Sequence, residues 1–87
     1  MITSAHYSVD GTAVRIATTN EGYRDVYVHV TSNAAIYLNG NSSVTTSTGF
    51  YVDKAAGPQV FLLAPQDEMW AIGTGTPVSV TVIITGP

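Results

Sequence analysis

The sequence contains no cysteine and few charged residues, and these two shortages exclude several classes of protein. Without cysteine there are no disulfide bonds, no thiol catalysis and no cysteine-ligated zinc. Three basic residues stand against six acidic ones, so the chain lacks the positive patch that phosphate contacts require, and we expect no nucleic acid partner. No apolar run approaches the ~20 residues that cross a bilayer, and the first residues lack the features of a signal peptide. We therefore expect no membrane association.

The low charge also describes the surface. Charged residues make up 10% of the chain, whereas an ordinary soluble domain carries roughly 25%. A surface of Thr, Ser, Asn and small apolar side chains is typical of a protein that neighbouring chains cover. With 45% hydrophobic residues among 87, the chain is expected to form one domain, residues 1–87, whose small core benefits from association.

The clearest pattern is an alternation of apolar and polar residues between positions 25 and 40. Apolar side chains at every second position are typical of half-buried β-strands. Here they indicate two strands separated by turn residues, with apolar faces formed by Val26, Val28 and Val30 and by Ile36 and Leu38. We predict that residues 25–40 form a β-hairpin whose strands fix each other's register.

The same pattern indicates further strands along the chain. Extended segments separated by turn residues are expected at 6–9, 13–17, 49–52, 59–63, 68–72 and 78–85. A Ser- and Thr-rich segment, 41–48, is expected to form a short edge strand or an extended loop. Segment 59–63 is apolar on both faces, which predicts a strand buried between two layers. No window of the sequence has helical periodicity.

These elements predict an all-β protein. The expected fold is an antiparallel β-sandwich of about seven to nine short strands, with Greek-key or jelly-roll-like connections. The predicted core consists of residues on the apolar faces of the alternating strands, namely Val26, Val28, Val30, Ile36, Leu38, Val60, Leu62, Val80 and Val82.

Few residues are suited to catalysis or metal binding. His6 and His29 are the only histidines, and because metal sites usually have clustered ligands, both are interpreted as surface or interface side chains. No serine stands in a Gly-x-Ser-x-Gly elbow. The adjacent carboxylates Asp67 and Glu68 are expected on opposite faces of a strand, where they cannot act on one bond. We predict no catalytic residue, no metal site and no cofactor, and a protein that is not an enzyme.

Aromatic side chains are the remaining candidates for binding. Planar rings with a polar edge can stack on a sugar, but they are also enriched in buried interfaces, and we favour core packing or subunit contact. Ile83 lies on the face of its strand opposite Val82 and Ile84, where a second chain would cover it. The predicted contact residues are Tyr27, His29, Tyr37, Tyr51, Trp70 and Ile83.

The order and spacing of several short motifs resemble small β-sandwich virion proteins of tailed bacteriophages. In that family an arginine precedes the first strand of a hairpin, Tyr-Leu-Gly-Gly ends the second strand, and Val-Thr and Gly-Phe follow. An Asp-Glu-Leu-Tyr-Ala-Val strand comes late. The matching positions, which extend over nearly the whole chain, are Arg24, Tyr37 with Leu38, Val44 with Thr45, Gly49 with Phe50, and Asp67 with Glu68.

Two positions depart from the family pattern. Asn39 and Gln66 stand where the family commonly has glycine. Asparagine can replace glycine where the backbone is left-handed, so neither departure puts the expected fold in doubt.

The resemblance implies an accessory capsid protein of the decoration or cement kind, which has no enzymatic activity and is often trimeric. Its expected partners are the major capsid protein and further copies of itself, and its expected location is the capsid exterior of a virion assembled in the host cytoplasm. An acidic chain is repelled by packaged DNA, which also favours the exterior. The alternative is a tail or fibre module that binds a host receptor or glycan through its aromatic side chains.

Overall fold

The computed structural model describes residues 1–86 and contains eight β-strands. They form where apolar and polar side chains alternate. The strands are β1 (Ile2–Val9), β2 (Val14–Ala17), β3 (Arg24–Val30), β4 (Ala35–Asn39), β5 (Phe50–Asp53), β6 (Gln59–Leu63), β7 (Met69–Ile72) and β8 (Val78–Thr85). A short 3₁₀ turn, η1 (Lys54–Ala56), follows β5. Within the described part of the chain, no helix has the length and apolarity that a membrane span requires.

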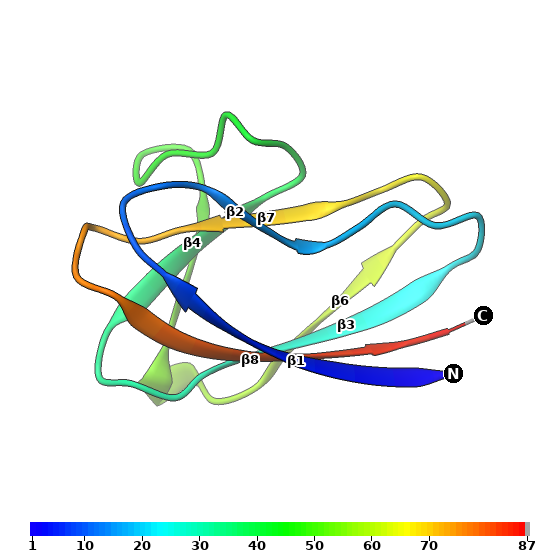
Figure 1. The fold of residues 1–87 in the computed structure, drawn as a ribbon, viewed down its shortest axis with the longest axis horizontal. Helices are drawn as coiled ribbons and strands as arrows, with labels where there is room; N and C mark the ends of the chain where they lie inside the picture. The colour runs from blue at the N-terminus through cyan, green and yellow to red at the C-terminus, as the bar shows by residue number, and fades with distance from the viewer. Residues whose placement is uncertain (87) are drawn as a thin grey trace.

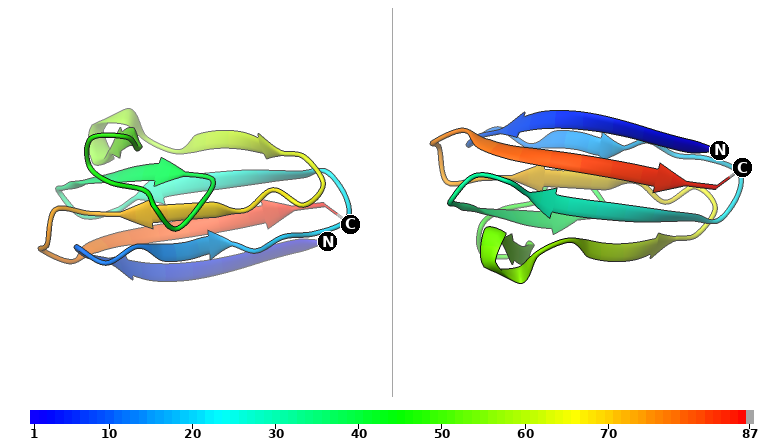
Figure 2. Two further views of the ribbon diagram at one scale, coloured as in Figure 1. Left: turned by 90° about the horizontal axis from the view of Figure 1, so that it is seen from above. Right: turned by 90° about the horizontal axis from the view of Figure 1, so that it is seen from below.

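The strands form two antiparallel four-stranded sheets that pack face to face (Figure 1). The first sheet has the order β1-β8-β3-β6, and the second has the order β2-β7-β4-β5. Figure 2 shows β5 and β6 at one edge of the sandwich and β1 and β2 at the other. Eight strands in two sheets with these crossing connections make a jelly roll. The predicted all-β sandwich is therefore confirmed.

The predicted hairpin over residues 25–40 is wrong, although both of its strands exist. β3 pairs with β6 and β8 in the first sheet, whereas β4 pairs with β5 and β7 in the second. The connecting segment bonds to the start of β8, because Thr31 donates its backbone N–H to the Ser79 carbonyl at 2.9 Å and Ser32 Oγ accepts from Ser79 N at 2.9 Å. An alternating pattern identifies the covered face of a strand, but it does not identify the neighbouring strand.

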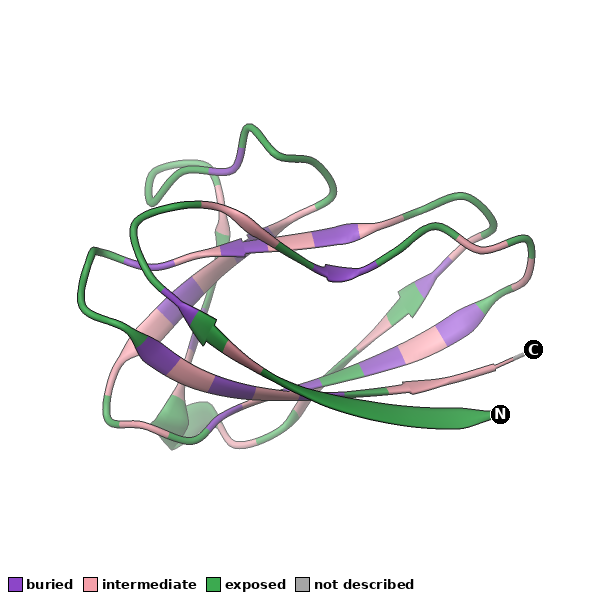
Figure 3. Ribbon diagram, viewed as in Figure 1, coloured by how far each residue is buried: buried purple, intermediate pink, exposed green. Residues whose placement is uncertain are grey.

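The core lies between the two sheets, and buried bands alternate along their strands (Figure 3). Seven of the nine predicted core residues are buried there, namely Val26, Val28, Val30, Ile36, Leu38, Val80 and Val82. Val60 and Leu62 are not core residues, since they are 56% and 67% exposed. β6 is an edge strand of the first sheet, and it turns Phe61 and Leu63 inward. Its outer face has no second layer over it, which overturns the prediction of a strand covered on both sides.

Gln66 adopts the left-handed backbone, with φ of 71°. Asn39 lies in β4 and does not adopt the left-handed backbone. Its side-chain oxygen accepts a hydrogen bond from Gly40 N at 2.7 Å. Of the two positions at which the resembling phage proteins commonly have glycine, only Gln66 therefore has a left-handed backbone in this chain. Its backbone N–H donates to the Asn20 carbonyl at 2.8 Å, which holds the turn between β6 and β7 against the loop before β3.

Arg24 is buried at the end of the sandwich where these loops meet. Its side chain is 5% exposed and donates to the backbone carbonyls of Thr18 and Asp67, the latter at 2.7 Å. Backbone carbonyls of two separate loops thus share one guanidinium, a fork-shaped donor suited to such bridging. Arg24 links the loop before β3 to the loop before β7.

Candidate functional site

The six predicted contact residues are divided between the two outer faces of the sandwich. Side chains alternate across each strand, so residues whose neighbours face the core point outward. By this alternation Tyr27, His29 and Ile83 lie on the outer face of the first sheet. The outer face of the second sheet carries Tyr37, Tyr51 and Trp70. The structure therefore presents two separate surfaces rather than one site.

The outer face of the first sheet carries a row of exposed apolar side chains. Ile83 on β8 lies opposite Tyr27 on β3, and Tyr27 lies opposite Val60 on β6. Tyr27 and Ile83 are 41% and 39% exposed. Leu62 extends the row along β6, where it lies opposite Asp25. We call Tyr27, Val60, Leu62 and Ile83 the apolar row. Val60 and Leu62 were predicted to be core residues, so neither was among the predicted contact residues.

The two histidines lie beside this row on the outer face of the first sheet. His6 on β1 and His29 on β3 both lie opposite Thr81 of β8, so one strand separates them. Two strand spacings amount to about 9.5 Å between their backbones. Residues 1–86 contain no group of three or more potential metal ligands. The histidines are a polar border of the apolar row.

On the second sheet, Trp70 is engaged by neighbouring polar side chains. Its indole Nε1 donates to Glu68 Oε1 at 2.8 Å, and the Arg15 guanidinium lies 6.0 Å from the ring centroid. Arg15 and Glu68 also form an ion pair at 3.5 Å. A cation over an indole face is attracted by the ring's quadrupole, and this arrangement places a guanidinium over one face of the ring.

Tyr37 and Tyr51 do not form a flat platform either. Their ring centroids are 5.5 Å apart and their planes meet at 68°, an edge-to-face contact. The loop 40–49 lies outside the second sheet (Figure 1). In this loop Val44 is 3% exposed, and Gly49 approaches the Tyr37 backbone and Cβ. The second sheet thus has a loop over part of its outer face, whereas the apolar row of the first sheet is exposed.

Tyr51 on β5 has a pKa that its neighbour Asp53 shifts. Its hydroxyl donates to Asp53 Oδ2 at 3.1 Å, and this hydrogen bond, together with the carboxylate's negative charge, raises the pKa of Tyr51 above its ordinary 10.0. Both effects favour the protonated phenol. The interaction of Tyr51 with Asp53 therefore stabilises the folded state below pH 10.0, and this stabilisation is lost as the pH rises through the raised pKa of Tyr51.

We expect Asp53→Asn to lower the pKa of Tyr51 toward its ordinary value, because asparagine removes the charge. Asp53 Oδ1 also accepts from Ala56 N at 2.9 Å, and an asparagine oxygen can keep that bond at the start of η1. An NMR titration of the Tyr51 ring measures the change. An unaltered midpoint in a correctly folded variant would show that the carboxylate does not cause the shift.

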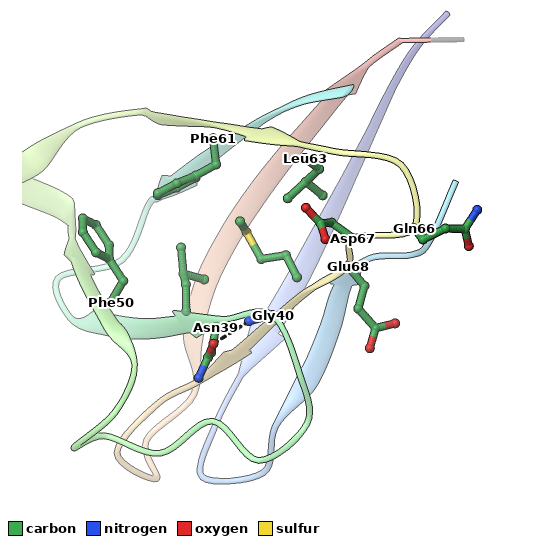
Figure 4. Close-up of a pocket in the computed structure, with 10 residues that line it drawn as sticks. Asn39, Gly40, Phe50, Phe61, Leu63, Gln66, Asp67 and Glu68 are labelled. Carbon is green, nitrogen blue, oxygen red and sulfur yellow. Dashed lines mark hydrogen bonds between the residues drawn. The ribbon is translucent and has the colours of Figure 1, made fainter. Parts of the chain in front are cut away.

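An apolar groove of about 420 Å³ opens between the sheets at the β5 and β6 edge (Figure 4). Phe50 and Phe61 contact each other edge to face there, with ring centroids 5.7 Å apart. In Figure 4, Asp67 points toward the groove beside Leu63, whereas Glu68 points away. Asp67 Oδ2 accepts from Ala64 N at 3.1 Å, and Glu68 is bound to Trp70. The two carboxylates do not converge, but the predicted reason is wrong, because both precede β7 and neither lies in a strand.

Comparisons with known proteins match the fold and not the sequence. No protein-family model matches the chain, and no curated protein is similar to it in sequence. A Bacillus protein described under "Bacillus endospore appendages form a novel family of disulfide-linked pili" superposes with a TM-score of 0.67 at 18% identity, over 97% of this chain and 83% of that one.

Two sugar-nucleotide enzymes also share the architecture. The dTDP-4-dehydrorhamnose 3,5-epimerase of Bacillus anthracis superposes with a TM-score of 0.58 at 13% identity, over 97% of this chain and 51% of the enzyme. RmlC of Streptococcus suis superposes with a TM-score of 0.59 at 8% identity, over 99% and 44%. The chain thus spans about half of each enzyme chain. At these identities the likeness concerns the fold alone.

Proposed function

We propose that this chain is a non-enzymatic structural protein of a tailed-phage virion, which binds the outside of the major capsid shell as a decoration or cement protein and stabilises it. The single observation that carries the proposal is the exposed apolar row on the first sheet. A row of large apolar side chains on an otherwise polar surface marks a contact with another protein. The motifs that resemble phage virion proteins give the class of partner.

The chemistry of the molecule is consistent with this role. The chain is acidic, with a formal net charge of −3, so an exterior position keeps it away from packaged DNA. The apolar row is bordered by histidines and threonine and carries one carboxylate, Asp25. Such a surface suits a contact that neighbouring subunits or the shell bury. We propose a homo-oligomer on the particle, and the resemblance favours a trimer.

Purified virions that carry the protein provide the test. We expect many copies per particle and, in a cryo-EM reconstruction, density on the outer surface with the first sheet facing a neighbouring chain. Ile83→Lys should reduce occupancy on the shell, because it places a charge at the β8 end of the apolar row. Ser42→Lys, in the exposed loop 40–49, is the matched control and should bind normally.

Other locations would contradict the proposal in recognisable ways. Density on the DNA side of the shell would remove the exterior assignment. Density at the tail tip, together with specific signals on a glycan array, would favour the receptor-binding module instead. Equal occupancy of the Ile83→Lys and Ser42→Lys variants would show that the apolar row does not contact the shell.

A further inference from the structure

The sandwich has four edge strands, and β6 is the one without an ionisable side chain. β1 and β6 are the edges of the first sheet, and β2 and β5 are the edges of the second. β1 carries His6, β2 carries Arg15 and β5 carries Asp53, whereas Gln59–Leu63 contains no ionisable residue. Charged side chains are a common means of keeping edge strands from pairing with other chains. β6 lacks that protection.

β6 is also apolar on both of its faces. Val60 and Leu62 point outward at 56% and 67% exposure. On the inner face, Phe61 contacts Phe50, which is itself 59% exposed at the mouth of the groove. A free strand edge with apolar side chains above and below it supplies both unpaired backbone groups and surface to bury. The feature therefore points to a strand from another molecule as its occupant.

We propose that two copies of this chain pair β6 to β6, antiparallel, around a two-fold axis at Phe61. A two-fold axis repeats every charge of the strand on the paired strand, so charges close to the axis would lie near like charges. Two edge strands, β1 and β6, carry no formal charge at pH 7, and β6 is the more apolar of the two, so it is the edge best suited to this symmetry. The pairing joins the two first sheets into one continuous sheet, and it extends the apolar row across the axis.

The sequence around β6 restricts the register of this pairing. Pro58 precedes the strand and Pro65 follows it by two residues. Proline has no N–H to give to a ladder, so pairing cannot extend past either residue. With the axis at Phe61, all five residues of β6 are paired, and Val60 of one subunit lies opposite Leu62 of the partner subunit. Any shift leaves residues of β6 without a β6 partner.

This contact rests on the proposed homo-oligomer but does not require the capsid. Because it is two-fold, the trimer that the resemblance favours can contain it only where two trimers pair into a hexamer. Sedimentation equilibrium and native mass spectrometry of the purified chain should find dimers or higher even-numbered species. Leu62→Lys should raise the dissociation constant at least about tenfold, since it places a lysine on each side of the axis. Ile2→Lys is the matched control, because Ile2 is 72% exposed on the other edge of the same sheet; its dissociation constant should stay unchanged.

Cysteine cross-linking tests the register, and the chain has no native cysteine to interfere. A mixture of the single variants Val60→Cys and Leu62→Cys should form a mixed disulfide dimer under mild oxidation. Neither variant should cross-link to itself, because the same residue in the two paired strands is displaced by two residues, about 7 Å along the strand direction. Added to the spacing between strands, this exceeds the ~7 Å that a disulfide can bridge between Cα atoms.

Three results would overturn the pairing. In the first, the wild-type chain stays monomeric at the highest soluble concentration. In the second, it forms an oligomer of odd copy number and the mixed cross-link is absent. In the third, the Leu62→Lys and Ile2→Lys variants associate equally well. Circular dichroism of each variant verifies that it is folded. Loss of dimers with normal binding to the capsid would reject the β6 contact alone, whereas dimers that never bind a capsid would reject the virion role alone.

Discussion

Replacement of Ile36 by alanine should lower the free energy of unfolding by about 2–5 kcal/mol, the range measured for deletion of buried aliphatic groups. Ile36 is 0% exposed in β4, where it lies opposite Val52 of β5. Truncation removes buried apolar contacts and leaves a cavity between two sheets that are held apart by the remaining core side chains. Equilibrium unfolding in urea measures the loss.

Leu62→Ala is the control for this experiment. The sequence predicts Leu62 to be a core residue, whereas the structure predicts that its truncation costs little stability. Leu62 is 67% exposed on the outer face of an edge strand, so its truncation should change the unfolding free energy of the monomer by less than about 0.5 kcal/mol. Protein concentrations below the dissociation constant of any dimer keep association out of the measurement. Equal losses for the two variants would contradict the assigned faces of β4 and β6.

Gly49→Ala should destabilise the protein by about 1–3 kcal/mol through overpacking. A Cβ at Gly49 would lie 2.5 Å from Tyr37 Cβ, 3.0 Å from the Thr45 carbonyl oxygen and 3.1 Å from the Tyr37 carbonyl carbon. Two of these atoms belong to the backbone, so no side-chain rotation relieves the overlap. The loop 40–49 must move away from β4, and thermal unfolding should show a lower midpoint.

Gly40→Ala is the matched control at the other end of the same loop. Its added Cβ would meet only the Glu68 carbonyl oxygen, at 3.7 Å, which is an ordinary contact. We expect a small change or a slight gain in stability, because alanine restricts the unfolded chain more than glycine does. Similar losses for both variants would mean that the loop is sensitive to any substitution and that the approach of Gly49 to Tyr37 is not the cause.

Strand positions were predictable from the sequence because alternation and turn residues are local signals. The predicted segments 59–63 and 78–85 coincide with β6 and β8. Strand partners were not predictable, because alternation is the same whether the neighbouring strand is next in the chain or distant from it. The pairing of β3 with β8 and β6 depends on packing of the whole sandwich, for which residues 25–40 contain no signal.

The candidate surfaces were predictable only in part, for a related reason. Tyr27 and Ile83 were identified as outward residues because each alternates with the apolar inward residues of its own strand. Val60 and Leu62 were assigned to the core because β6 is apolar throughout, and a strand buried on both faces has the same composition as an unprotected edge. Only the position of β6 within its sheet distinguishes these cases.

The nested order of strand pairs determines how the chain can fold during synthesis. β4 pairs with β5, β3 with β6, β2 with β7 and β1 with β8, so each pair encloses the one before it. The loop closed by each successive pair is longer, which favours assembly from the centre outward and slows folding. β8 lies between β1 and β3, so the first sheet cannot be completed until the last strand has left the ribosome. Until then the nascent chain leaves the partners of β8 without their neighbour, and chaperones would have the longest access to this protein at β1 and β3.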